Sequence, residues 1–93
     1  MSVWTVDTWK IKLGSEDHFL KHCAGLSPDK LVLFRDLDEQ GLFWSPAKWK
    51  SREELEAWRT GSTYKSALAK IEGDMSEHFT HVMDEVPEFP SRP

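Results

Sequence analysis

Residues 31–58 read LVLFRDLDEQGLFWSPAKWKSREELEAW, and this stretch decides the fold. Its segments 31–37 and 42–49 are rich in the aliphatic and aromatic residues that strands favour, and the polar turn 38–41 lies between them. We therefore predict a β-hairpin. Pro46 lies in the second strand and cannot donate a ladder hydrogen bond, so we expect that strand to be at an edge or bulged there.

A helix follows the hairpin directly. Ser51 and Glu54 have the spacing of a capping box, in which both side chains accept hydrogen bonds from free backbone N–H groups at the helix start. Gly61 interrupts this helix, and Gly73 ends its second part. Between the two glycines, four residues recur at the spacing of one helix face: Tyr64, Ala67, Leu68 and Ile71. The sequence therefore predicts a helix in two parts.

The segment before the hairpin predicts a strand and a short helix. The strand is expected over 3–13, and its apolar residues change from even to odd positions midway. We therefore expect a bulge, or burial on both faces, near Asp7 and Thr8. Ser15 is a good N-cap for a helix that ends near Gly25.

The last strand is expected over 75–86, and the prolines of 87–93 mark a tail that cannot continue a sheet. The resulting order, β-α-β-β-α-β, is the ferredoxin-like α+β fold, in which two helices cover one face of a four-stranded antiparallel sheet. Residues 1–93 are then a single domain. Strand 31–37 carries apolar residues on both faces, so we expect a homodimer that stacks sheet on sheet; a monomer with a partly exposed sheet is the alternative.

Composition argues against several classes of protein. Sixteen Asp and Glu against twelve Lys and Arg give a net charge of −4, which disfavours nucleic acid or an anionic membrane as a partner. The predicted strands also lack the basic and aromatic motif of RNA-binding sheets with this topology. No stretch is long and apolar enough to span a membrane, residues 1–25 do not resemble a secretory signal, and the single Cys23 forms no internal disulfide. We therefore expect a cytoplasmic protein.

The segment 49–59, WKSREELEAWR, followed by Tyr64, resembles the antibiotic biosynthesis monooxygenase family. The resemblance covers nearly the whole chain and implies a dimeric α+β barrel. Family members that oxidise aromatic polyketides work without metal, haem or flavin and bind a flat phenolic substrate between sheet and helices. The resemblance therefore implies a monooxygenase without a cofactor, acting on a small aromatic or quinol-type molecule and dioxygen.

Site residues carry over from the family unevenly. Its helix tryptophan and the tyrosine six positions later are present as Trp58 and Tyr64. Its basic residue on the final strand falls on His78, and its helix asparagine falls on Glu54, which the capping box already explains. Asp7 stands where haem-degrading members have an asparagine, and we take it as a candidate base; an exposed strand aspartate is the alternative.

Haem degradation is disfavoured because Leu68 stands where that branch of the family has its histidine ligand. We take Leu68 as a candidate substrate-binding residue, together with Phe19, Phe34 and Trp44. Among Trp9, Trp44 and Trp49, Trp44 is the best candidate for a pocket wall, and the core or the dimer interface is the alternative place for all three.

The histidines leave one question open. His78 and His81 lie on opposite faces of the last strand, and the sequence does not decide which of them faces the pocket. His18 and His22 are four apart on one helix, a spacing that can seat a metal, but no third ligand is evident, so we expect no metal site.

Packing is the alternative role for the helix residues. Trp58 and Tyr64 have the spacing of core residues, and Arg59 with its neighbouring glutamates is expected on a solvated helix face. The alternative function is a non-catalytic dimeric module that binds a small molecule or scaffolds an assembly.

Overall fold

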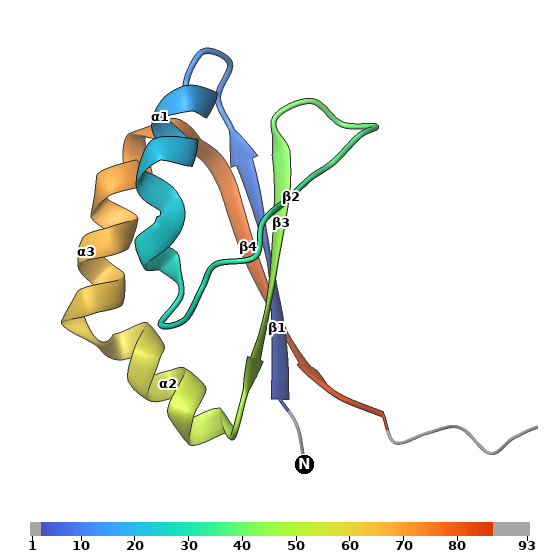
Figure 1. Ribbon diagram of the computed structural model, residues 1–93, viewed down its shortest axis with the longest axis vertical. Coiled ribbons are helices and arrows are strands. Elements are labelled where there is room, and N and C mark those ends of the chain that lie inside the picture. Colours follow the sequence, from blue (N-terminus) through green and yellow to red (C-terminus); the bar gives the residue numbers. More distant parts are fainter. Residues whose placement is uncertain (1–2, 87–93) are drawn as a thin grey trace, which may run out of the picture.

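The computed structural model describes residues 3–86, so the predicted tail 87–93 lies outside the described residues (Figure 1). The strands are β1 (Val3–Ile11), β2 (Phe34–Arg35), β3 (Leu42–Trp49) and β4 (Met75–Asp84), and the helices are α1 (Glu16–His22), α2 (Arg52–Thr60) and α3 (Ser62–Ile71). Two 3₁₀ turns, η1 (Cys23–Leu26) and η2 (Glu72–Asp74), follow α1 and α3. The antiparallel sheet has the order β2-β3-β1-β4, and all three helices lie on one face of it (Figure 1). This confirms the ferredoxin-like α+β fold, although β1 and β4 end before residues 13 and 86.

β1 is a central strand, and its odd-numbered residues face the helices. Trp9 and Ile11 are buried there in the main hydrophobic core. Of the two alternatives predicted near Asp7 and Thr8, the bulge is wrong, because the pairing with both neighbouring strands is continuous through these residues; both faces of the strand are instead partly buried there. The register shift lies instead between Lys10 and Ile11, in the pairing with β4. The change of apolar residues from even to odd positions does not indicate a bulge in this strand, because some of its inward-facing positions hold polar residues.

The signals for α2 and α3 are confirmed. Ser51 Oγ accepts a hydrogen bond from the backbone N–H of Glu54 at 3.1 Å, and Glu54 Oε1 accepts one from the backbone N–H of Lys50 at 3.0 Å. Gly61 separates the two helices. Ser15 does occupy the N-cap of α1, but its side chain makes no capping hydrogen bond.

The second strand is much shorter than the predicted 31–37. Only Phe34 and Arg35 pair with β3. Before them, Leu31 and Leu33 pack against the core between sheet and helices, so the chain is still crossing from the helix layer to the sheet at this point.

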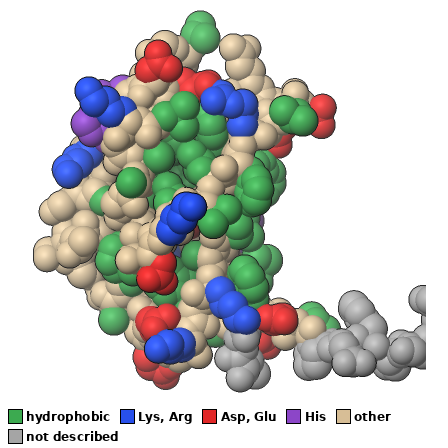
Figure 2. Space-filling model, viewed as in Figure 1, with side chains coloured by type: hydrophobic (Ala, Val, Ile, Leu, Met, Phe, Trp, Pro, Cys, Tyr) green, Lys and Arg blue, Asp and Glu red, His purple; other side chains and the backbone are tan. Residues whose placement is uncertain are grey.

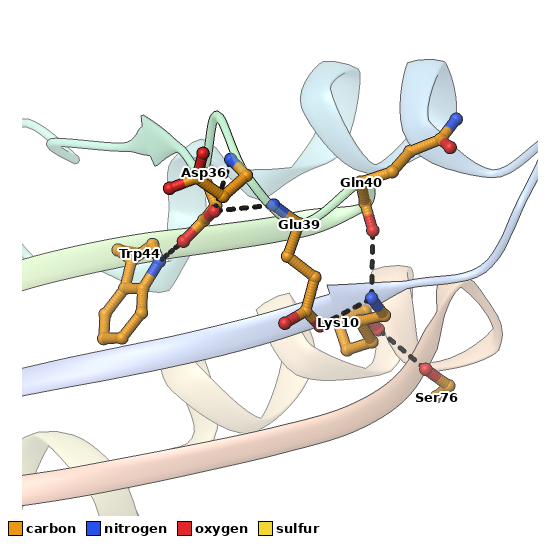
Figure 3. Close-up of polar contacts among 7 residues, drawn as sticks. Lys10, Asp36, Glu39, Gln40, Trp44 and Ser76 are labelled. Atoms are coloured by element: carbon orange, nitrogen blue, oxygen red, sulfur yellow. Dashed lines mark hydrogen bonds and ion pairs between the residues drawn. The ribbon is translucent and has the colours of Figure 1, made fainter.

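Asp36 holds the turn that follows β2 (Figure 3). Its Oδ1 accepts hydrogen bonds from the backbone N–H groups of Asp38 and Glu39 at 2.9 and 2.8 Å, and its Oδ2 accepts one from Trp44 Nε1 at 2.9 Å. These bonds, that of Trp44 foremost, lower the pKa of Asp36 from its ordinary value. Lys10 Nζ donates to Glu39 Oε2 at 2.7 Å, so the turn is also tied to β1.

The sheet face opposite the helices is apolar and open. Strand register places Phe34, Trp44, Thr8 and Phe79 in one row across it. Phe34 and Phe79 are each 57% exposed. Figure 2 shows hydrophobic side chains along the right-hand edge of the view, where no helix covers the sheet. A single chain therefore leaves this face uncovered.

Candidate functional site

A pocket lies between the sheet and helices α2 and α3. Its lining bounds about 390 Å³ of empty space, open solvent included, so it is a narrow, partly open cleft and not an enclosed cavity. Its walls include apolar and aromatic side chains of β3, α2 and α3: Trp49, Leu55, Trp58 and Tyr64. Its floor is a group of polar side chains on the sheet: Thr5, Asp7, Ser45 and Thr80. The pocket thus has flat apolar walls and a few polar groups, the usual composition of a site for a small organic molecule.

Asp7 carries the negative charge of this floor. Strand register places it between Ser45 of β3 and Thr80 of β4. Its Oδ1 accepts hydrogen bonds from Thr80 Oγ1 and from His78 Nε2, the latter at 3.0 Å. A carboxylate can only accept, so this arrangement requires a proton on Nε2 of His78.

The His78 ring is held in place from one side by Trp9. The two rings are stacked, with centroids 3.8 Å apart and planes 8° apart. Trp9 is itself fixed, because it is 1% exposed and its Nε1 donates to Ser45 Oγ at 2.8 Å. The core therefore sets the position of the imidazole that binds Asp7.

Two polar atoms of the pocket keep free hydrogen-bonding capacity. Both bonds to Asp7 end on Oδ1, and within residues 3–86 no hydrogen bond reaches Oδ2. The Tyr64 hydroxyl has no hydrogen-bond partner in the same part of the chain. No buried side-chain nitrogen or oxygen of the described residues lacks a partner, so both of these atoms are accessible. Both residues line the pocket, so these two polar groups are the candidates for binding a ligand there.

Tyr64 is held in its neutral form. Partial burial, and secondly the nearby charge of Asp7, raise the pKa of Tyr64 to about 12, although Arg59 acts in the opposite direction. Its ring lies 5.9 Å from that of Trp58, centroid to centroid, at 47°. At neutral pH Tyr64 is therefore a hydrogen-bond donor beside an aromatic wall.

The structure brings the four candidate catalytic residues together. Asp7, Trp58 and Tyr64 line one pocket, and His78 lies behind Asp7. The structure also answers the question left open between the two histidines: His78 pairs with the inward-facing Trp9, whereas His81 pairs with Val6 on the open face. The proximity of these four residues is a structural finding, while their catalytic roles stay a prediction.

The four candidate substrate-binding residues do not line this pocket. Trp44 and Phe34 lie on the opposite face of the sheet, where Asp36 binds the Trp44 indole (Figure 3). Phe19 is completely buried in the core, and Leu68 packs against that core. The structure therefore does not bring these four residues to this pocket: the face of a strand decides this for Trp44 and Phe34, and packing into the main core decides it for Phe19 and Leu68.

Sequence reasoning missed several lining residues. Thr80 is two positions after His78, so strand alternation puts both on one face, and this was an available signal. Trp49 belongs to the segment that resembles the family, but its place in the pocket wall follows only from the fold. Its Nε1 donates a hydrogen bond to Thr5 Oγ1 at 3.0 Å. Arg59 lines the pocket, although its charged neighbours had suggested a solvated helix face.

The second histidine pair is placed elsewhere. His18 Nδ1 lies 2.6 Å from Asp74 Oδ2, and the His18 and His22 rings are 4.4 Å apart. Across residues 3–86, no three or more His, Cys, Asp or Glu side chains are grouped so that they could hold a metal ion. Nor do the helices in this range include one with the length and apolar character needed to cross a membrane.

No family model matches the sequence, and no curated protein matches it. Solved structures do match. One described as an antibiotic biosynthesis monooxygenase has a TM-score of 0.78 and 20% identity, over 91% of this chain and 99% of that chain. A candidate antibiotic biosynthesis monooxygenase from Caulobacter crescentus has a TM-score of 0.81 and 20% identity, over 92% and 91%. A protein from Mycobacterium tuberculosis has a TM-score of 0.79 and 14% identity, over 95% and 98%. The chain therefore has the fold of the antibiotic biosynthesis monooxygenase proteins.

Proposed function

We propose that this protein is a cofactor-independent monooxygenase that oxidises a small phenol or quinol with dioxygen. The observation that carries the proposal is the position of the Asp7 carboxylate and the hydrogen bonds it accepts. Its carboxylate lies in a pocket with aromatic walls; His78 and Thr80 hold one oxygen, and the other is accessible. A base fixed in this way can take a proton from a hydroxyl group on a flat substrate. The fold supports the proposal only in general terms, because one fold hosts many activities.

The chemistry explains why a base is needed. Dioxygen in its triplet ground state reacts slowly with closed-shell molecules, so an enzyme without a cofactor must make its substrate electron-rich. A phenolate is such a substrate. It gives one electron to dioxygen, and the two radicals join as a peroxide on a ring carbon. The peroxide then loses water as the O–O and ring C–H bonds break. A phenol and one dioxygen thus give a quinone and one water.

Each residue has a role that its surroundings support. Asp7 Oδ2 takes the phenol proton and returns it to the peroxide anion. His78 stabilises the Asp7 carboxylate by donating from Nε2, and its stacking on Trp9 keeps that donor in position. Tyr64 donates a hydrogen bond to the substrate oxyanion, since it stays neutral at physiological pH. Trp58 provides a stacking surface beside it.

We propose further that the working unit is a homodimer that stacks the open faces of two sheets. Phe34, Trp44 and Phe79 lie in one row of this face, and all three are exposed in a single chain. A monomer rarely leaves a continuous apolar patch of this kind in water. A second copy buries it symmetrically and adds apolar burial to a chain with a small core.

Dioxygen uptake tests the catalytic proposal. Purified protein treated with a chelator is supplied with anthrones, hydroquinones and related phenols, and the wild type is compared with Asp7→Asn and with Asp17→Asn as a control. Asp17 is an exposed carboxylate in the first turn of α1. We expect Asp7→Asn to lower the rate by roughly 10²–10⁴-fold, the usual contribution of a positioned base, and Asp17→Asn to leave it unchanged.

Full activity in Asp7→Asn would refute the assignment of Asp7 as the base. Ligand-dependent thermal stabilisation of the wild type without any uptake would favour the binding module instead.

A further inference from the structure

One charged side chain of the pocket has no part in the reaction proposed above. Arg59, in the last turn of α2, lines the pocket with Trp58 and Tyr64. Its guanidinium is close enough to the Tyr64 hydroxyl to counteract the rise in the Tyr64 pKa. Arg59 therefore belongs to the same cavity as Asp7, with the opposite charge.

The guanidinium has little to hold it within the protein. Its nearest ionic partner among residues 3–86 is Glu56, whose Oε1 lies 3.9 Å from Nη1. That distance is too long for a hydrogen bond, and a helix-surface pair at this spacing contributes little to stability. The Arg59 side chain is 38% exposed, so its five N–H donors are available to a ligand at the pocket.

The charge of the whole chain gives this arginine a further significance. At a net charge of −4 the protein repels anions on average, and Asp7 adds a negative charge at the pocket floor. A neutral phenol needs no cation for its binding. A local guanidinium, by contrast, matches the planar geometry of a carboxylate and can bind it through two parallel hydrogen bonds.

We propose that the ligand of this pocket is an aromatic phenol that carries a carboxylate, and that Arg59 binds the carboxylate while the phenol hydroxyl faces Asp7. The phenol end of this assignment rests on the proposed function, whereas the carboxylate end rests on Arg59 alone. Arg59 is then a specificity-determining residue, which selects acidic aromatic molecules over neutral ones of the same shape.

Calorimetric titration under anaerobic conditions tests the proposal without turnover. The probes are 6-hydroxy-2-naphthoic acid and 2-naphthol, which share the ring and the hydroxyl but differ in the carboxylate. Hydrogen bonds between charged groups contribute about 1.5–3 kcal/mol, so we expect Arg59→Gln to weaken the acid by roughly 10- to 100-fold and 2-naphthol by less than about twofold. Arg59→Lys keeps the charge but cannot make two parallel hydrogen bonds to a carboxylate, so we expect an intermediate loss of affinity for the acid.

The control is Arg52→Gln, which removes the same charge from the exposed start of the same helix and is expected to leave both affinities unchanged. The proposal is overturned if the wild type binds the acid no more tightly than 2-naphthol, or if Arg59→Gln weakens both probes equally.

Its failure is also distinguishable from failure of the oxygenase proposal. Selective, Arg59-dependent binding of the acid without dioxygen uptake from acidic hydroquinones supports this inference and refutes the oxygenase. Asp7-dependent uptake of dioxygen with neutral phenols, together with no preference for acids in binding, supports the oxygenase proposal and refutes this inference.

Discussion

The single tyrosine of the chain allows the electrostatics of the pocket to be measured directly. Partial burial and the charge of Asp7 raise the pKa of Tyr64 to about 12, whereas a tyrosine in an unfolded chain titrates near 10. At about pH 11 we therefore expect roughly a tenth of the tyrosine to be ionised in the folded protein and roughly nine-tenths in urea. The ultraviolet absorbance of tyrosinate reports both values, and circular dichroism checks that the first sample is still folded.

The same shift makes stability depend on pH in a defined direction. The folded state holds the Tyr64 proton more tightly than the unfolded state, so this contribution is complete below about pH 10 and is lost as the pH rises toward 12. Linkage gives an upper bound of about 1.4 kcal/mol lost at pH 11, and screening of the partly exposed ring reduces the expected value to roughly 1 kcal/mol.

Tyr64→Phe supplies the matched comparison, since every other group titrates in both proteins. Between about pH 8 and pH 11, urea unfolding should show the wild type losing roughly 1 kcal/mol more than Tyr64→Phe. Equal losses in the two proteins, or a tyrosinate midpoint near 10 in protein that is still folded, would refute the placement of Tyr64 in a pocket beside Asp7.

Two further predictions concern the turns and the open face. Gly14 and Gly41 have φ values of +87° and +80°, but only at Gly41 would a Cβ meet a backbone atom, the carbonyl oxygen of Ile11 at 2.8 Å. Urea unfolding should therefore show Gly41→Ala to be less stable than Gly14→Ala by at least about 1 kcal/mol, and equal losses would count against this turn geometry. Phe79→Glu places a charge in the proposed dimer interface, so sedimentation equilibrium at micromolar concentration should show a monomer, while Leu13→Glu, at a site 93% exposed, should remain dimeric. A monomeric wild type, or a dimeric Phe79→Glu, would contradict the proposed dimer.

The parts of the fold that were predicted correctly depend on local signals. The capping box at Ser51 and Glu54, the break at Gly61 and the polar turn between the hairpin strands each act within a few residues. Their order along the chain then restricted the topology to one ferredoxin-like arrangement. The shortening of β2 was not predictable in this way, because Leu31 and Leu33 leave the sheet to fill a core built by distant segments.

Face assignments failed where they depend on register between strands. Strand alternation places Trp44 and Trp49 on opposite faces, but only the pairing with β1 decides which face meets the helices. In β4 the register shift opposite Lys10 and Ile11 lets Met75 and His78 face the same core, although their numbers differ in parity. The residue types of the candidate site were thus visible in the sequence, but the walls of its pocket were not.

The unequal edges of the sheet bear on how the protein tolerates crowding. β2 has only two residues in the ladder, so within the described residues β3 is itself the edge from residue 45 to residue 49, and Pro46 there has no N–H to offer an incoming strand. The long edge is β4, with ten residues, and there the shift against β1 disturbs the regular ladder, while Glu77 and Asp84 place charges along it. Edge-to-edge growth into aggregates is therefore opposed by a proline on one side, and by irregular pairing and charge on the other.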